Sequence, residues 1–190
     1  MPNIARRHLL CAGAAGLILP ARAQTPDVAA LLKTGGVVIA FRHALAPGTF
    51  DPPGFRLGDC GTQRNLSEEG RAQARRIGAW FRSRGLQPAV VRSSPWCRCL
   101  ETAELAFGRA EAWPALGSPR AGTEETNARS LAALCQALAA AVRQPGRFEA
   151  WVTHMFVLGD LLGANTASGE GLVLGLDAAG APRVLARLAA

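Results

Sequence analysis

Five short apolar runs have the length and composition of β-strands: residues 36–41 (GVVIAF), 87–92 (QPAVVR), 148–153 (FEAWVT), 171–176 (GLVLGL) and 182–188 (PRVLARL). Short, nearly continuous apolar runs are typical of strands buried on both faces, as in a parallel sheet. The last two runs are separated by a turn sequence, DAAG, and predict a hairpin.

Segments between these runs carry helix signals: residues 27–34, 67–84, the stretch from Ser94 onward, 124–142 and 154–162. Ser67 is an N-cap residue type, and the two glutamates after it favour the positive end of a helix dipole. Ser94 is expected to be the next N-cap, with Pro95 as the first helical residue. Strands alternating with helices predict an α/β fold, a three-layer α/β/α sandwich with a mostly parallel central sheet.

Residues 44–65 interrupt this alternation. The segment is rich in glycine, proline and aspartate and has no strand or helix period. Loops of this length inside a compact domain are uncommon and are usually functional. We therefore expect residues 44–65 to take part in the site.

The N-terminus has the order of an export signal. Arg6 and Arg7 precede an apolar stretch, residues 9–19, and small residues follow up to Ala23. The stretch is too short to span a bilayer, and a buried N-terminal helix is the alternative interpretation. We predict a signal peptide at 1–23 and one domain at 24–190, with no integral membrane segment after cleavage. The protein would be periplasmic or secreted, and the paired arginines also permit twin-arginine export.

Charge narrows the range of partners. The net charge is +7, and the isoelectric point is near 10.4. Without residues 1–23 the chain has eighteen basic and fourteen acidic side chains, a net charge of +4. The arginines are scattered and tyrosine is absent, which disfavours a single-strand stacking platform. We expect no nucleic-acid partner. Anionic small molecules and an anionic membrane surface both fit the charge, which alone does not choose between them.

Chemistry-bearing residues follow the predicted strands. Arg42 and His43 end the first strand, His154 follows the third, and Arg98 lies in the first turn of the helix after the second. Ligands bind beyond the carboxyl ends of strands in open α/β sheets, and a helix N-terminus favours anions. Guanidiniums beside imidazoles suit a phosphoryl group. The alternatives are a structural histidine bonded to backbone and an arginine that only caps its helix.

Four segments resemble motifs of the histidine phosphatase superfamily, which includes the cofactor-dependent phosphoglycerate mutases: Phe41–Ala44 (FRHA), Asn65–Ala74 (NLSEEGRAQA), Ser93–Ala103 (SSPWCRCLETA) and Val152–His154 (VTH). They occur in family order. Ala44 stands where the family has glycine, and Met155 follows His154 where mutase-like members often have glycine.

The resemblance implies a phosphatase for phosphate monoesters or phosphoramidates, metal-independent and acid-type. It implies His43 as the phosphorylated nucleophile and Arg42, Arg98 and His154 as the phosphate pocket. The substrate would be a small phosphorylated molecule, and no cofactor is expected. Hydrolysis is favoured over mutase activity because export would separate the protein from glycolytic intermediates.

Family members usually supply a carboxylate that protonates the leaving oxygen. Glu124, Glu125 and Glu170 are the candidates for this general acid, and solvated carboxylates are the alternative interpretation. Some small members lack the acid. From another functional class, the same cradle would also suit a non-catalytic periplasmic binding protein for phosphorylated sugars or lipid headgroups.

Four cysteines remain after residues 1–23: Cys60, Cys97, Cys99 and Cys135. An oxidising compartment favours a disulfide, and Cys60 in the long loop lies at the same rim as the two cysteines that flank Arg98. We predict a bridge from Cys60 to Cys97 or Cys99, with Cys135 reduced, and free buried thiols as the alternative. The one-residue gap between Cys97 and Cys99 argues against zinc, and no metal site is expected.

Overall fold

The computed structural model describes residues 27–118 and 124–189, so the predicted signal peptide lies outside the described residues. Its strands are β1 (Val37–Arg42), β2 (Val90–Ser93), β3 (Glu111–Ala112), β4 (Phe148–Thr153), β5 (Gly171–Leu176) and β6 (Pro182–Leu188). Its α-helices are α1 (Val28–Thr34), α2 (Glu68–Arg82), α3 (Cys97–Phe107), α4 (Glu124–Ala141) and α5 (Met155–Leu162), with 3₁₀ turns η1 (Cys60–Thr62) and η2 (Pro114–Leu116).

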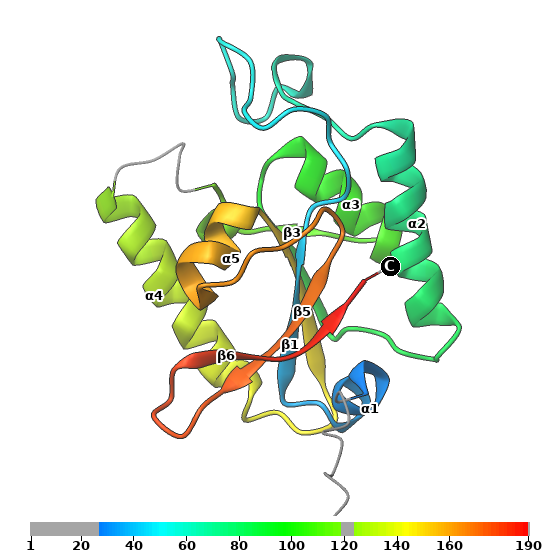
Figure 1. Cartoon of the computed structure of the whole chain (residues 1–190), viewed down its shortest axis with the longest axis vertical. Helices are drawn as coiled ribbons and strands as arrows, with labels where there is room; N and C mark the ends of the chain where they lie inside the picture. Colours follow the sequence, from blue (N-terminus) through cyan, green and yellow to red (C-terminus); the bar gives the residue numbers. More distant parts are fainter. Residues whose placement is uncertain (1–26, 119–123, 190) are drawn as a thin grey trace, which may run out of the picture.

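The strands form one sheet in the order β3-β2-β4-β1-β5-β6 (Figure 1). The four strands from β3 to β1 are parallel, whereas β5 runs antiparallel to β1 and pairs with β6 as the predicted hairpin. The sheet is therefore mostly parallel, as predicted. The two-residue strand β3 was not predicted from the sequence.

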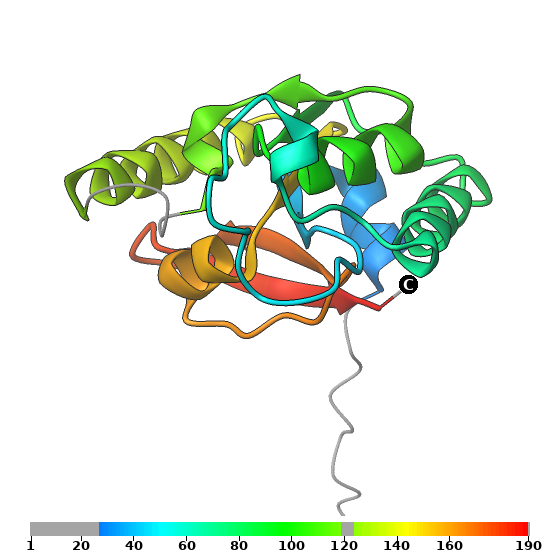
Figure 2. The same ribbon diagram turned by 90° about the horizontal axis from the view of Figure 1, so that it is seen from above.

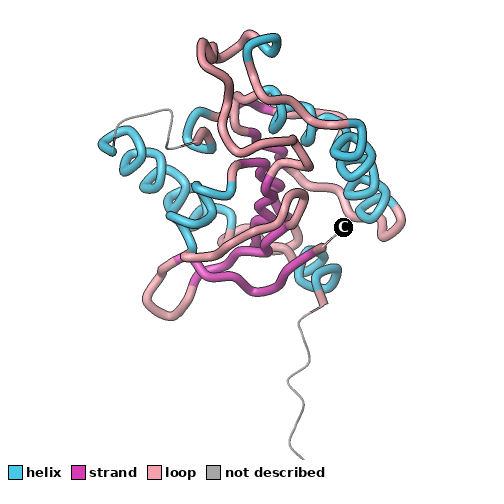
Figure 3. Tube along the Cα trace, turned by 45° about the horizontal axis from the view of Figure 1, so that its top comes forward, coloured by secondary structure: helices cyan, strands magenta, loops and turns pink. Residues whose placement is uncertain are grey.

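Alternate residues of β1 face two different cores. Val37, Ile39 and Phe41 pack in the core that includes residues of α1, α2 and α3. Val38 and Ala40 pack in the core that includes residues of α4 and α5. Because both faces are covered, the strand contains almost no polar residues, and the predicted three layers are confirmed (Figure 3).

The first residues of α2 pack against the backbone of the long loop at Leu45. Ser67 is the N-cap as predicted, and its hydroxyl accepts a hydrogen bond from the backbone N–H of Gly70 at 3.0 Å. A Cβ at Gly70 would lie 2.0 Å from the carbonyl oxygen of Leu45. Glycine at position 70 thus lets the helix approach the backbone of the loop.

The predicted start of α3 was wrong. The helix begins at Cys97 and not at Pro95, and its N-cap residue is Trp96. The hydroxyl of Ser94 is instead in hydrogen-bond contact with His154 Nε2 at 2.8 Å. Arg98 nevertheless lies in the first turn.

Residues 44–65 extend beyond the carboxyl ends of the parallel strands, at the top of Figure 1. Seen from above, the loop passes over the middle of the molecule (Figure 2). Among the described helices, none has the length and apolar character needed to cross a membrane.

Candidate active site

The two histidines meet because of strand register. Arg42 of β1 pairs with Thr153 of β4, so the residues that follow each strand, His43 and His154, are neighbours. Their ring centroids are 5.6 Å apart. Both line a cavity of about 300 Å³, and Arg42 and Arg98 line it too. The structure thus brings together the four residues selected from the sequence.

His43 is buried, with 2% of its surface exposed. Its Nδ1 lies 2.7 Å from the carbonyl oxygen of Ala44, and a carbonyl can only accept, so Nδ1 carries the hydrogen. The lone pair of the neutral ring is then on Nε2. Burial, together with the positive charges of Arg98 and two other arginines, lowers the pKa of His43 to about 3, despite the opposing effect of the Ala44 contact. The ring is therefore neutral at ordinary pH.

His154 has the opposite tautomer. Nη2 of Arg98 lies 3.4 Å from its Nδ1, and because a guanidinium only donates, Nδ1 accepts. In the neutral ring the hydrogen then lies on Nε2 and is donated to the hydroxyl of Ser94. Burial first, and then the charge of Arg98, hold the pKa of His154 well below its usual value.

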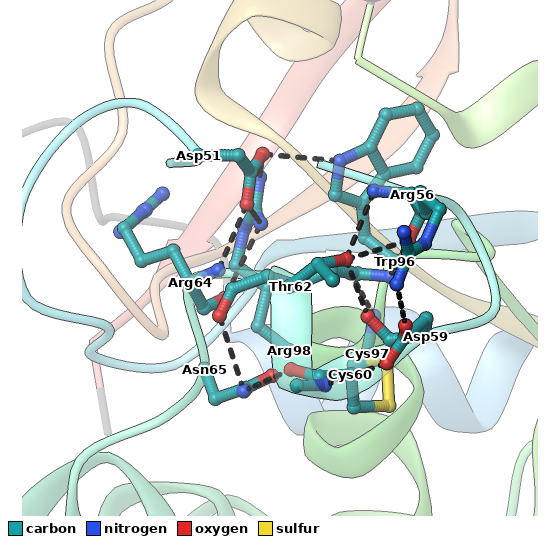
Figure 4. The surroundings of a disulfide bond; sticks show 12 residues. Asp51, Arg56, Asp59, Cys60, Thr62, Arg64, Asn65, Trp96, Cys97 and Arg98 are labelled. Carbon is teal, nitrogen blue, oxygen red and sulfur yellow. Dashed lines mark hydrogen bonds and ion pairs between the residues drawn. A yellow bond between two sulfur atoms is a disulfide. The ribbon is translucent and has the colours of Figure 1, made fainter. Parts of the chain in front are cut away.

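Asp51, in the loop, pairs with Arg98 (Figure 4). Its Oδ1 accepts from Nη1 at 2.7 Å and its Oδ2 from Nη2 at 3.2 Å, a bidentate arrangement. The carboxylate also accepts from the indole N–H of Trp96 and the backbone N–H of Arg64. Burial raises the pKa of Asp51, but the hydrogen bonds from Arg98 and Arg64 outweigh this effect, so the pKa lies below its usual value.

The Asp51 carboxylate contacts only one edge of the Arg98 guanidinium. Asp51 occupies the edge formed by Nη1 and Nη2, while Nε is buried without a hydrogen-bond partner among the described residues. The side chain of Arg98 is 4% exposed. A buried, charged donor of this kind is costly unless an acceptor reaches it.

Two further arginines line the cavity. Arg42 donates through Nη1 to the carbonyl oxygen of Thr166 at 2.8 Å. Arg64 donates through Nη1 to the carbonyl oxygens of Ala46 and Gly48, so its guanidinium holds the loop and lines the cavity at once. Burial lowers the pKa of both arginines. Arg64 was not predicted from the sequence, although it directly precedes the segment NLSEEGRAQA.

One of the two predicted bridges is present, between Cys60 and Cys97 (Figure 4). The alternative pairing with Cys99 was wrong: Cys99 is free and buried, with Sγ 3.6 Å from the carbonyl oxygen of Thr153. Burial raises the pKa of Cys99 to about 12, so it stays a thiol. Cys135 is free, as predicted.

Of the three candidate general acids, only Glu170 has a side chain in the described part of the structure. Glu170 forms an ion pair with Arg187 at 2.8 Å and accepts from the backbone N–H of Ala167, and it does not line the cavity. Glu124 and Glu125 lie in the first turn of α4, and their side chains are outside the described part of the chain. Among the described lining residues Asp51 is the carboxylate, and it was not predicted from the sequence.

The described residues that line the cavity supply three guanidiniums, one carboxylate and two neutral imidazoles. With Asp51 ionised, the charged groups sum to +2, which matches a phosphate dianion. Among the residues that the structure describes, no group of three or more histidines, cysteines or acidic residues could hold a metal ion. The arrangement can bind an anionic group and present a neutral nitrogen nucleophile to it.

A sequence model of the histidine phosphatase superfamily (branch 1) matches residues 58–120. Among curated proteins, no sequence matches the chain. The matched segment runs from the end of the long loop through α3 and includes Arg64 and Arg98. The match confirms the resemblance over the segments Asn65–Ala74 and Ser93–Ala103, whereas Phe41–Ala44 and Val152–His154 lie outside it.

Solved structures share the fold. The protein histidine phosphatase SixA complexed with tungstate is 18% identical, with a TM-score of 0.53 over 80% of this chain and 96% of that one. A mutant phosphoserine phosphatase from Entamoeba histolytica, in complex with phosphoserine, is 12% identical over 80% and 95%, with a TM-score of 0.54. Phosphoglycerate mutase from Thermus thermophilus is 23% identical over 81% and 99%, with a TM-score of 0.50.

Proposed function

We propose that this protein is a phosphatase that hydrolyses a phosphate monoester or phosphoramidate through a phosphohistidine on His43. The proposal starts from the resemblance to the histidine phosphatase superfamily. The observation that carries the proposal is the buried, neutral His43, whose Nε2 is left with its lone pair in a cavity with three guanidiniums. A nucleophile next to an anion-binding cradle is the requirement for phosphoryl transfer.

His43 is prepared as a nucleophile by its surroundings. The hydrogen bond from Nδ1 to Ala44 fixes the ring, and burial keeps the proton off Nε2 down to low pH. A protonated imidazole has no lone pair to offer, so this depressed pKa supports attack on phosphorus.

Arg98 is the proposed centre of the phosphate pocket. Asp51 holds one edge of its guanidinium and so fixes the plane in which Nε and the remaining N–H groups lie. We assign Asp51 as a positioning residue for Arg98. Arg42 and Arg64 would bind other phosphate oxygens.

The chemistry proceeds in two steps. Nε2 of His43 forms a bond to phosphorus as the bond to the leaving oxygen or nitrogen breaks, and the leaving group takes its proton from solvent. Water then attacks phosphorus, the P–N bond breaks and its electron pair returns to Nε2, and inorganic phosphate is released. The arginines stabilise the negative charge in both steps.

We also propose that the protein functions in an oxidising compartment after export. The bridge between Cys60 and Cys97 supports this proposal, because disulfides are rare in reducing cytosol. A chain that begins after residue 23 would keep every residue of the proposed site.

Turnover of p-nitrophenyl phosphate by site variants tests the proposed function. His43→Ala should reduce the rate at least a thousandfold, since the nucleophile is lost, and Arg98→Lys at least tenfold, since a point charge cannot replace a planar fork. Arg92→Lys is the matched control, because Arg92 pairs with Glu149 outside the cavity. A His43→Ala rate within tenfold of the parent would contradict the assignment.

A further inference from the structure

The cavity has two chemically different parts. Among its charged and titratable residues, His43 and Arg98 are deeply buried, at 2% and 3% exposed, whereas Arg42, Arg64 and Asp51 are half-buried. Four apolar residues are also exposed or half-buried in the lining, and we call them the mouth: Phe50 is 67% exposed, and Phe55, Met155 and Phe156 are half-buried. The cavity therefore has a cationic floor, formed by the arginines around the buried histidines, and a largely aromatic mouth beside it.

The mouth is built from two segments. The long loop supplies Phe50 and Phe55, and the start of α5, directly after His154, supplies Met155 and Phe156. These apolar groups lie on both the loop side and the helix side of the cavity. They are thus placed to contact an organic group attached to a phosphate in the cavity.

The aromatic side chains on the loop side are held by their neighbours. The ring of Phe55 stacks on that of Trp96, with centroids 5.6 Å apart and planes inclined by 18°. Phe50 directly precedes Asp51, whose carboxylate is fixed by Arg98. The exposed ring of Phe50 is thus attached to backbone that is anchored at the cavity floor.

Polar partners for a hydroxylated substrate are few in this mouth. Among the described lining residues, the neutral hydroxyl side chains are Thr49 and Ser118. The indole N–H of Trp96 is already bound to Asp51. A sugar or glycerol moiety in the mouth would give up hydrogen bonds to water for contacts with aromatic rings, which costs free energy.

We infer that the site selects phosphate monoesters whose organic part is apolar and ring-shaped, with the phosphate on the arginine floor and the ring against Phe50, Phe55 and Phe156. This inference rests on the proposed phosphatase function and names its substrate class. Apolar walls with a small number of placed polar groups are typical of sites that recognise such ligands.

Phosphonates test the inference without turnover, because their C–P bond is not hydrolysed. Benzylphosphonate and 2-hydroxyethylphosphonate present the same anion with an aromatic and a polar organic part. We expect calorimetry on the whole protein to show benzylphosphonate binding at least tenfold tighter. Equal affinities, or tighter binding of the hydroxyethyl compound, would overturn the inference.

A matched pair of loop variants assigns the preference to the mouth. Phe50→Ala should weaken benzylphosphonate binding about five- to tenfold and leave the affinity for inorganic phosphate within about twofold. Leu57→Ala is the control, because Leu57 is the other large apolar side chain exposed among the described residues, at 53%, and does not line the cavity. Equal effects of the two substitutions would overturn the inference.

The two proposals fail separately. If benzylphosphonate binds preferentially but p-nitrophenyl phosphate is not turned over, the phosphatase assignment is wrong and the aromatic preference stands as a binding property. If turnover is present and no preference is found, the phosphatase assignment stands and the substrate class is wrong. Binding of neither phosphonate would contradict both.

Discussion

Arg98 and Asp51 show how a buried charge can be both stabilised and kept available. A lone buried guanidinium is strongly unfavourable, and the bidentate carboxylate offsets part of that cost. Asp51 uses the Nη1–Nη2 edge, Nη1 and Nη2 also contact the Arg64 carbonyl and His154, and Nε is the one Arg98 donor without a partner among the described residues. The same contact fixes the guanidinium plane, so the carboxylate can influence catalysis without touching the substrate.

Asp51→Asn tests this positioning role. The amide has nearly the same shape but no charge, so we expect kcat/KM for p-nitrophenyl phosphate to fall at least tenfold while Asp51→Glu recovers part of the loss. Asp59→Asn, which removes an exposed carboxylate paired with Arg56 in the same loop, should have no effect. Tighter binding of inorganic phosphate by Asp51→Asn would instead show that Asp51 competes for Arg98.

His43 should make the fold sensitive to acid. Its pKa is about 3 in the folded protein and near 6.5 when unfolded, so the unfolded chain binds more protons as the pH falls below 6.5. The contribution of the neutral His43 to the free energy of unfolding is complete above pH 6.5 and is lost progressively as the pH falls toward 3. At pH 5 this loss is about 2 kcal/mol for one group with this shift.

The comparison of the parent with His43→Gln measures this contribution. Urea unfolding at pH 7 and pH 5 should show a larger fall in the free energy of unfolding for the parent, since glutamine does not titrate. An identical pH dependence for both proteins would mean that burial does not hold His43 neutral.

At the scale of elements, the long loop depends on α3 for its position. Four contacts tie it to the first residues of that helix: the bridge from Cys60 to Cys97, the pairing of Asp51 with Arg98, the stacking of Phe55 on Trp96, and the hydrogen bond from the Cys97 N–H to Gln63. The loop contains only the short turn η1 as regular structure. Its position therefore depends on long-range contacts.

Loss of the bridge should loosen this arrangement. The bridged residues are 37 apart in the sequence, and the chain-entropy model assigns such a closure on the order of 3–4 kcal/mol. We expect Cys60→Ser/Cys97→Ser to lower the melting temperature and to raise KM, since Asp51 and Phe50 lose their anchor. Cys135→Ser is the control because Cys135 is free. An unchanged melting temperature and KM in the double variant would contradict the tether.

The elements near the site were partly predictable. The strands β1 and β4 were found because burial on both faces leaves an apolar run, and the histidines follow directly from those strands. The start of α3 was misplaced because Ser94 has a long-range partner in His154, and local capping preference cannot anticipate such a contact. Residues 97 and 99 lie on different sides of α3, so only one of them can face the loop. The sequence alone does not show which side of the helix faces the loop, and both bridge partners therefore stayed open.

At the scale of the whole molecule, the carboxyl ends of three adjacent parallel strands create the site. The strands β2, β4 and β1 end together, so residues from distant parts of the sequence converge. This convergence follows from fold class and could be predicted. The roles of Asp51 and Arg64 could not, because they depend on how an irregular loop folds back over that edge.

Trapping of the phosphorylated protein tests the central claim most directly. The purified protein is mixed with p-nitrophenyl phosphate and quenched in alkaline denaturant during turnover, because phosphohistidine survives base. Peptide mass spectrometry then identifies the phosphorylated residue and distinguishes phosphohistidine from phosphoserine. We expect phosphate on the peptide containing His43, none in His43→Asn, and unchanged labelling in the control Arg92→Lys. Sustained turnover by the parent with phosphate on a residue other than His43 would contradict the account. Sustained turnover with no phosphorylated peptide in the parent or in Arg92→Lys would contradict it as well.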